Sequence, residues 1–403
     1  MELRQRHLAD APAAEAARPD FPERDRGRAS RAADARNYAD NYDADAEYKR
    51  GVPRPPGSLP DDTGRPTPRA AAPRPVELHH DERGRTEEPG ARDRIDAEWG
   101  DAPRAVVDRP SIRDPLSDDS PDAYADLLTH PDGTRFSCFD GPPRREQAIQ
   151  GRLRDCGVIA ALGSVANHLP DELTSRVRLE SDGTYRVTLS EARRTEAGAV
   201  PTGRDVELSV TSDVPVRNAA PDVPVGAAAA DGAAWSPVLE KALAGVDQTW
   251  TLQRRVAWQG DWVGICADAS ADSAAGPIRD PAPTGYSRLN QGTDAWDRAE
   301  LLTQLTGQPA EVRELPSGDD EWKINRIIRT QLEDGKPVLV SSRDQTHVRE
   351  SLPHGLQAHH VYEATGVEKG RIILRNPWNE DHPDPMDTDE FARNIRRCYT
   401  TLI

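Results

Sequence analysis

Apolar residues recur at spacings of three and four directly behind a cysteine near the middle of the chain. This pattern predicts a helix over 156–169 with one face buried against a core. Its apolar positions are Val158, Ile159, Leu162, Val165 and Leu169. Three further helices are predicted over 235–244, 294–305 and 321–332, the last two ended by a glycine and a proline.

Alternating apolar and polar residues predict strands on both sides of these helices. The first two strands are expected over 184–190 and 205–211, with a polar connection over 193–204 between them. The later strands are expected over 337–341, 360–365, 371–375 and 399–403. A stretch rich in Gly, Ala and Asp, 251–283, predicts a surface loop. Helices followed by antiparallel-type strands predict an α+β fold with a helical N-terminal part and a β-rich C-terminal part.

Large apolar residues are sparse before this region. Residues 1–117 are rich in Arg, Asp, Glu, Pro and Ala, with many prolines over 53–75. Such a segment cannot bury enough apolar surface to offset the entropy of ordering it. It is therefore predicted to be a disordered N-terminal extension, and the ordered domain is placed at 118–403. The extension could be an inert linker, an autoinhibitory segment or a recruitment region.

The composition limits the partners and the compartment. The 403 residues carry a formal net charge of −17, which argues against a nucleic-acid partner. The four cysteines form no C-x-x-C pair, so neither a zinc site nor a dense disulfide framework is indicated. The chain has no apolar signal segment and no stretch long enough to span a membrane. We therefore expect a soluble cytoplasmic protein without a membrane partner, although a non-standard secretion route would leave no sequence signal.

The residues around the cysteine predict thiol chemistry. Cys156 stands at the start of the first helix, where the helix dipole and free N–H groups favour a thiolate. Asp155 is a candidate cap for those N–H groups. Gln150, six positions earlier, can offer its side-chain amide to an oxyanion beside the backbone N–H of Cys156. The alternative interpretation is a buried structural cysteine.

A thiol nucleophile needs a base and a group that orients the base. His360 begins a predicted strand, and Asn376 follows the next one, so a hairpin can place the two side chains together. His359 is the rival base, because neighbouring strand residues point to opposite faces. Trp378 could cover the histidine and the asparagine and exclude water.

These landmarks resemble the protease core of the calpain family, papain-like cysteine peptidases of two subdomains with the site in the cleft between them. The resemblance covers about residues 135–400 in the family's order. The matching residues are Gln150-Gly151, Asp155-Cys156, Ala160-Ala161-Leu162, Trp235, Leu239-Glu240-Lys241-Ala242, Tyr286, Leu289, Gly292, Leu305-Thr306-Gly307, His360-Val361-Tyr362 and Arg375-Asn376-Pro377-Trp378.

The resemblance implies a nucleophile subdomain over about 135–283 and a histidine and asparagine subdomain over about 284–403. It places the nucleophile on Cys156, the general base on His360 and the orienting amide on Asn376. The oxyanion-hole amide falls on Gln150, and the expected reaction is hydrolysis of peptide bonds in a protein or peptide substrate. The family's His-Ala-Tyr pattern favours His360 over His359.

Three positions depart from the family pattern. Gly157 stands where the family usually has tryptophan, Asn379 stands where a glycine is common, and the paired glycine is Gln291-Gly292. These changes bear on substrate preference more than on the type of reaction, because all four expected catalytic side chains are present.

Calcium is the one cofactor that the resemblance implies, because calpains commonly couple calcium to subdomain alignment. The sequence contains no EF-hand pattern. The acidic run 380–390 could bind a hard cation, but a solvated loop is the simpler interpretation. Two other functions stay open: transamidation, deamidation or acyl transfer at the same site, and a catalytically degenerate interaction module.

Overall fold

The computed structural model describes residues 105–112, 121–270, 281–343 and 352–403. Within these ranges the chain is a mixed α+β structure, as the sequence predicts. No helix in the described part of the chain is both long and apolar enough to cross a membrane.

A sheet of nine described strands runs through the structure, in the order β11-β10-β9-β12-β8-β5-β4-β3, and β1 pairs with β5 outside this path. The bounds are β1 Ala105–Val107, β3 Val177–Leu179, β4 Tyr185–Thr195, β5 Gly198–Val210, β8 Ala310–Glu314, β9 Val338–Ser342, β10 Val361–Glu368, β11 Arg371–Arg375 and β12 Ile395–Leu402. The two halves of the sheet meet where β5 pairs with β8. A smaller sheet contains β2 (Ala123–Asp126), β6 (Asp213–Arg217) and β7 (Ala220–Pro224) in the order β2-β6-β7.

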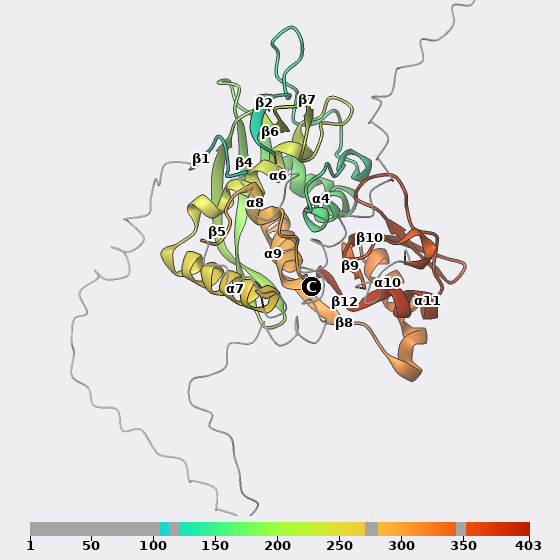
Figure 1. Ribbon diagram of the computed structural model, residues 1–403. Coiled ribbons are helices and arrows are strands. Elements are labelled where there is room, and N and C mark those ends of the chain that lie inside the picture. The colour runs from blue at the N-terminus through green and yellow to red at the C-terminus, as the bar shows by residue number, and fades with distance from the viewer. Residues whose placement is uncertain (1–104, 113–120, 271–280, 344–351) are drawn as a thin grey trace, which may run out of the picture.

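The helices pack on both halves of the large sheet. Their bounds are α4 Cys156–His168, α5 Pro170–Arg176, α6 Trp235–Gly245, α7 Leu252–Ser270, α8 Tyr286–Leu289, α9 Ala295–Thr306, α10 Ile324–Glu333 and α11 Thr388–Asn394. In Figure 1, α9 runs through the middle of the molecule, with β4 and β5 on one side and the C-terminal strands on the other. Asp294 caps α9 by accepting a hydrogen bond from the Asp297 N–H, and Gly307 ends the helix in the left-handed conformation.

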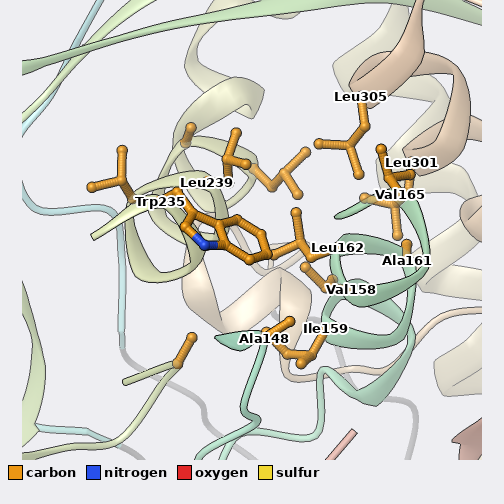
Figure 2. Packing of buried hydrophobic residues seen from close by; sticks show 14 of the residues in the cluster. Ala148, Val158, Ile159, Ala161, Leu162, Val165, Trp235, Leu239, Leu301 and Leu305 are labelled. Carbon is orange, nitrogen blue, oxygen red and sulfur yellow. The ribbon is translucent and has the colours of Figure 1, made fainter. Parts of the chain in front are cut away.

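The larger hydrophobic cluster surrounds α4. Every residue of α4 from Cys156 to Ala166 is buried, so the helix is enclosed on all sides and not on one face alone. Figure 2 shows the Trp235 indole beside Leu162 and Val158, with Leu301 and Leu305 of α9 near Val165, further along α4. The Trp235 Nε1–H donates to Gln147 Oε1 at 3.1 Å, which satisfies the polar atom of a fully buried ring. This packing holds the start of α4 in a fixed position.

A second hydrophobic cluster lies around the C-terminal strands. It joins Ile324 and Ile328 of α10 to Tyr362 of β10 and Phe391 of α11. Ile324 and Ile328 lie four residues apart on the buried face of α10, and β10 is buried from Val361 to Ala364. The cluster fixes the hairpin of β10 and β11.

Two sequence predictions about secondary structure are wrong. Residues 251–283 do not form a loop, because α7 occupies Leu252–Ser270, while 271–280 lie outside the described residues. Residues 193–204 are not a polar connection, because β4 and β5 pair as far as Thr195 and Gly198. Cross-strand pairing therefore outweighs the weak local preference of these polar residues.

The predicted boundary and the predicted division of elements also need correction. Residues 1–104 of the expected extension lie outside the described residues, but β1 pairs in parallel with β5. The boundary at residue 117 is therefore too late. The N-terminal part contains helices, as predicted, among them α4 and α6, but also the long strands β4 and β5.

Candidate active site

Cys156 is the first residue of α4 and lies against the beginning of β10. Only 6% of its surface is exposed. The backbone N–H of Val361 is directed at the sulfur, so the residue that follows His360 contacts the thiol. As the first helical residue, Cys156 has a backbone N–H without an acceptor inside the helix. The thiol and a backbone N–H with no acceptor inside the helix therefore belong to the same residue.

Gln150 is hydrogen-bonded to two segments, one that follows Asn376 and one that precedes Cys156. Its backbone N–H donates to the Pro377 carbonyl at 2.9 Å, which links it to the segment behind Asn376. Its side-chain Nε2 donates to the Leu153 carbonyl at 2.6 Å. An amide nitrogen carries two hydrogens, so the bond to Leu153 orients the group and leaves one hydrogen for another acceptor. The Gln150 Oε1 atom is buried without a hydrogen-bond partner in the described residues.

His360 is held by backbone and ring contacts. Its N–H donates to Ser342 Oγ at 3.0 Å, and the Ser342 N–H donates to the His360 carbonyl at 2.9 Å. Its ring lies 4.9 Å from the Tyr362 ring and 4.6 Å from the Trp378 ring, measured between centroids. His360 is buried, whereas its neighbour His359 is exposed and has a φ of +52°. The structure thus brings His360, and not His359, to the asparagine.

Asn376 orients that ring. Its Oδ1 lies 2.9 Å from His360 Nε2, and its Nδ2 donates to the Asp381 carbonyl at 3.2 Å. Because Nδ2 must donate, Oδ1 is the atom that faces the ring, and Nε2 carries the ring hydrogen. The other ring nitrogen, Nδ1, is then the one able to accept a proton.

The protonation state of the thiol differs from the sequence expectation. Burial raises the pKa of the Cys156 thiol to about 11, although the Val361 N–H and Arg298 act in the opposite direction. Burial therefore opposes the ionised form that the helix N-terminus is predicted to favour. Removal of water from the sulfur outweighs the partial charge of the helix end.

Asp155 does not cap α4. Its side chain makes no capping hydrogen bond, although the backbone carbonyl accepts from the Val158 N–H at 2.8 Å. The carboxyl is fully buried beside Glu240 of α6. Burial raises the pKa of both groups, and for Glu240 the nearby Asp155 raises it further. The prediction of an Asp155 cap is wrong, because this side chain points into the protein.

No family model matches the chain, and no curated protein matches it.

The position after the nucleophile is closed by Thr293. A Cβ on Gly157 would lie 1.9 Å from Thr293 Oγ1, so no larger residue fits there without a shift. Thr293 belongs to the segment before α9, and in this segment Asn290 Oδ1 accepts the Arg154 N–H at 2.9 Å. The space that a larger side chain at position 157 would need is thus occupied by Thr293.

The Asn379 departure has a backbone explanation. Asn379 has a φ of +59°, in the left-handed region. Glycine adopts this conformation without cost, and asparagine tolerates it better than most residues. The turn behind Asn376 therefore keeps its shape without a glycine.

No metal centre is found in the described residues. No three or more His, Cys, Asp and Glu side chains gather there in a way that could hold an ion. In the acidic run, Asp387 caps α11 by accepting the Glu390 N–H at 2.9 Å. The run is partly explained by this capping, and we derive no step from calcium.

Sequence reasoning missed several residues around the site. These are Ser342 and Asn290, which hold backbone at the site, the buried ion pairs of Glu363 with Arg145 and Arg375, and the buried Arg298. Their positions depend on contacts between distant segments. The one available signal was a charged residue inside an apolar pattern, as at Glu363 and Arg298.

Proposed function

We propose that the chain is a calpain-like cysteine endopeptidase in which Cys156, His360, Asn376 and Gln150 carry the reaction. The main support is the 2.9 Å contact between His360 Nε2 and Asn376 Oδ1, directly beside the residue whose N–H faces the Cys156 sulfur. This is the arrangement that a thiol nucleophile with an oriented base needs.

The first step is attack of the Cys156 sulfur on a peptide carbonyl carbon. Because the pKa of the buried thiol is raised to about 11, the resting sulfur is protonated at neutral pH. His360 Nδ1 therefore takes the proton as the bond between sulfur and carbon forms. The oxyanion accepts hydrogen bonds from the Cys156 N–H and from the second hydrogen of Gln150 Nε2.

Collapse of this intermediate releases the amine, which takes its proton from His360, and leaves a thioester on Cys156. Water then attacks the thioester carbonyl with His360 as base. The free thiol and a carboxylic acid result. Asn376 holds the ring in one orientation throughout, since its own amide is fixed by the Asp381 carbonyl.

The test is incubation with a mixed peptide library, with and without added calcium, read by mass spectrometry. We expect the wild-type chain to cleave peptides and the Cys156→Ala variant to leave them intact. Cys398→Ala is the matched control, because this half-buried thiol lies in β12. Full cleavage by Cys156→Ala would overturn the proposal. A one-dalton shift or a crosslink without cleavage would replace hydrolysis of peptide bonds by deamidation or transamidation.

A thiol-directed epoxide inhibitor separates the enzyme from an interaction module. We expect labelling at Cys156 and none at Cys398. Absence of labelling at Cys156 together with absence of cleavage would favour the degenerate module.

A further inference from the structure

Arg298 is a buried cation without an anionic partner in the described structure. It lies in the first turn of α9 and is 1% exposed. Its Nη1 donates to the Thr293 carbonyl at 2.9 Å. Its Nε and Nη2 atoms have no hydrogen-bond partner among the described residues. Burying an unpaired guanidinium is costly, so an anion close to it would be strongly favoured.

The contacts of Thr293 connect Arg298 to the turn that carries Cys156. Thr293, which accepts from Arg298, packs against Gly157 so closely that a Cβ there would lie 1.9 Å from Thr293 Oγ1. The positive charge of Arg298 acts on the Cys156 sulfur and lowers its pKa, against the larger effect of burial. Thr293 thus links Arg298 of α9 to Gly157, the residue that follows Cys156 in α4.

We propose that Arg298 is the buried counter-cation of the Cys156 thiolate, a positioning residue that favours the ionised sulfur during the reaction. When the sulfur ionises, the guanidinium gains the anion that it lacks in the resting form. The thiol proton passes to His360 Nδ1, so charge is conserved inside the site. The inference rests on the proposed role of Cys156 as nucleophile.

Other charged groups around the thiol do not supply this cation. The titratable and charged groups that face Cys156 are Asp155 on its own turn, Glu240 on α6 through Asp155, His360 before β10, Tyr362 on β10 and Arg298 on α9. Asp155 disfavours the thiolate. Burial raises the pKa of Tyr362 to about 12, so this phenol stays neutral up to high pH. In the proposed reaction His360 takes the thiol proton, whereas Arg298 carries a positive charge throughout.

The test is the pH dependence of Cys156 alkylation by iodoacetamide in the full chain, with the site of alkylation identified by mass spectrometry. The thiolate absorbance at 240 nm, taken against the corresponding Cys156→Ala chain, gives the same ionisation without reagent access. We expect Arg298→Gln to raise the apparent pKa of Cys156 by about 1 or more, as loss of a close opposite charge does. Arg298→Lys keeps the positive charge but holds it on a shorter side chain. It is therefore expected to raise the apparent pKa of Cys156 less.

Arg176→Gln is the matched control. Arg176 is also largely buried, but it lies beside Gly307 at the other end of α9. It is expected to leave the pKa of Cys156 unchanged. An unchanged pKa in folded Arg298→Gln would overturn the inference. If that variant does not fold, Arg298→Met takes its place, because it also removes the charge, and an unchanged pKa of Cys156 in it overturns the inference equally.

The peptide assay keeps the two proposals apart. A raised pKa in Arg298→Gln, together with a wild-type chain that cleaves nothing, would support the counter-cation and refute the peptidase. Cleavage by the wild-type chain with no change of pKa in either Arg298 variant would do the reverse.

Discussion

The amide of Asn376 determines which nitrogen of the His360 ring can accept a proton. Its Nδ2 is committed to the Asp381 carbonyl, and its Oδ1 also accepts the Trp378 N–H at 3.1 Å. The ring of His360 can therefore bond to Asn376 through Nε2–H alone, and Nδ1 remains the proton acceptor. A change at Asn376 should act on catalysis through the orientation of the ring.

We expect Asn376→Ala to lower kcat/KM for a cleaved peptide by about 10²-fold, as a misplaced catalytic group does. Asn376→Asp keeps an oxygen that accepts from His360 Nε2 and is expected to retain more activity than the alanine variant. Steady-state kinetics on a peptide from the library measure both. Equal activities of the two variants would exclude an orienting role.

The second residue-scale prediction concerns Gly157. Gly157→Ala places a Cβ 1.9 Å from Thr293 Oγ1, and such overpacking is expected to lower the free energy of unfolding by roughly 1–3 kcal/mol. Thr293→Ala removes that oxygen, so the double variant should regain part of the loss. Urea unfolding measures these values.

Gly260→Ala in α7 is the control, because a Cβ there meets no atom within 4 Å. It is expected to be neutral or stabilising, as alanine usually is in a helix. A similar loss in Gly157→Ala and Gly260→Ala would show that the contact with Thr293 is not the cause.

The sequence predicts which residues gather at the site better than it predicts their charge states. The six-residue spacing of Gln150 and Cys156 and the hairpin ends at His360 and Asn376 are local patterns, and the structure brings His360 and Asn376 together. The raised pKa of Cys156 depends on burial from several distant segments, which no spacing records. Arg298 was missed for the same reason.

At the scale of elements, α6 supports the loop between Gln150 and Cys156. Glu240 Oε1 accepts the Ala227 N–H at 2.9 Å. The Val225 carbonyl in turn accepts the Arg152 N–H at 2.7 Å, just beyond Gln150. Gly226 allows this approach, because a Cβ there would lie 2.3 Å from Glu240 Oε2. Helix α6 thus supports the segment between Gln150 and Cys156 indirectly, through the backbone of residues 225–227.

The contribution of Glu240 to the stability of the folded chain should depend on pH. The pKa of Glu240 is raised well above 4.5 in the folded state by burial and by Asp155. The folded chain therefore binds a proton that the unfolded chain has already lost, and stability declines as pH rises from about 4.5 towards the folded pKa. Glu240→Gln removes this titration, so its unfolding free energy should fall less than that of the wild-type chain between pH 5 and 8.5.

Urea unfolding at pH 5, 7 and 8.5 measures the difference. Glu180→Gln is the control, because Arg178 and Arg186 lower the pKa of this partly exposed carboxylate, so it is ionised in the folded state and largely ionised in the unfolded state over that range. If the unfolding free energies of Glu240→Gln and the wild-type chain changed in parallel with pH, Glu240 would not hold an extra proton in the folded state.

Helices and strands with strong patterns were predictable, and the exceptions are informative. The α4 and α9 helices follow their apolar spacings, and α9 also has its predicted glycine stop at Gly307. The α7 helix was missed because its sequence is weakly amphipathic and rich in Gly, Ala and Asp. The ends of β4 and β5 were missed because pairing with each other, and not composition, makes them strands.

At the scale of the whole molecule, a buried ion-pair cluster connects the two hydrophobic clusters. Glu363 on β10 is fully buried, with Arg145 Nη2 at 3.4 Å and Arg375 Nη1 at 3.8 Å from its oxygens. Arg375 Nη2 donates to the Ala148 carbonyl at 2.8 Å, so β11 is joined to the segment that leads to Gln150. The arginine that precedes Asn376 thereby links the strand beside His360 to the segment before Cys156.

We expect Arg375→Met to destabilise the chain by roughly 3–5 kcal/mol at pH 8.5, because a buried carboxylate loses a cationic partner. Burial raises the pKa of Glu363 to about 7, so the carboxyl is mostly neutral at pH 5, and the loss should be smaller there. The double variant Arg375→Met and Glu363→Met should recover much of the loss. Denaturant unfolding at both pH values measures the effect.

Arg204→Met is the control for an exposed pair. Arg204 contacts Glu191 at 2.8 Å, but its side chain is 64% exposed, and its loss should cost about 0–1 kcal/mol. An Arg375→Met loss that is the same at pH 5 and pH 8.5 would show that the charge of Glu363 is not involved.

The continuous sheet and the position of α9 affect how the molecule can be divided. The Leu301 and Leu305 side chains of α9 pack in the same cluster as α4, and β8 pairs with β5 through Glu311 and Ala310. A cut between residues 283 and 284 would therefore strip the nucleophile half of its covering helix. We expect that neither fragment folds alone. The two halves are thus not exchangeable modules, and recombination between distant relatives could not assemble the site from separately inherited parts.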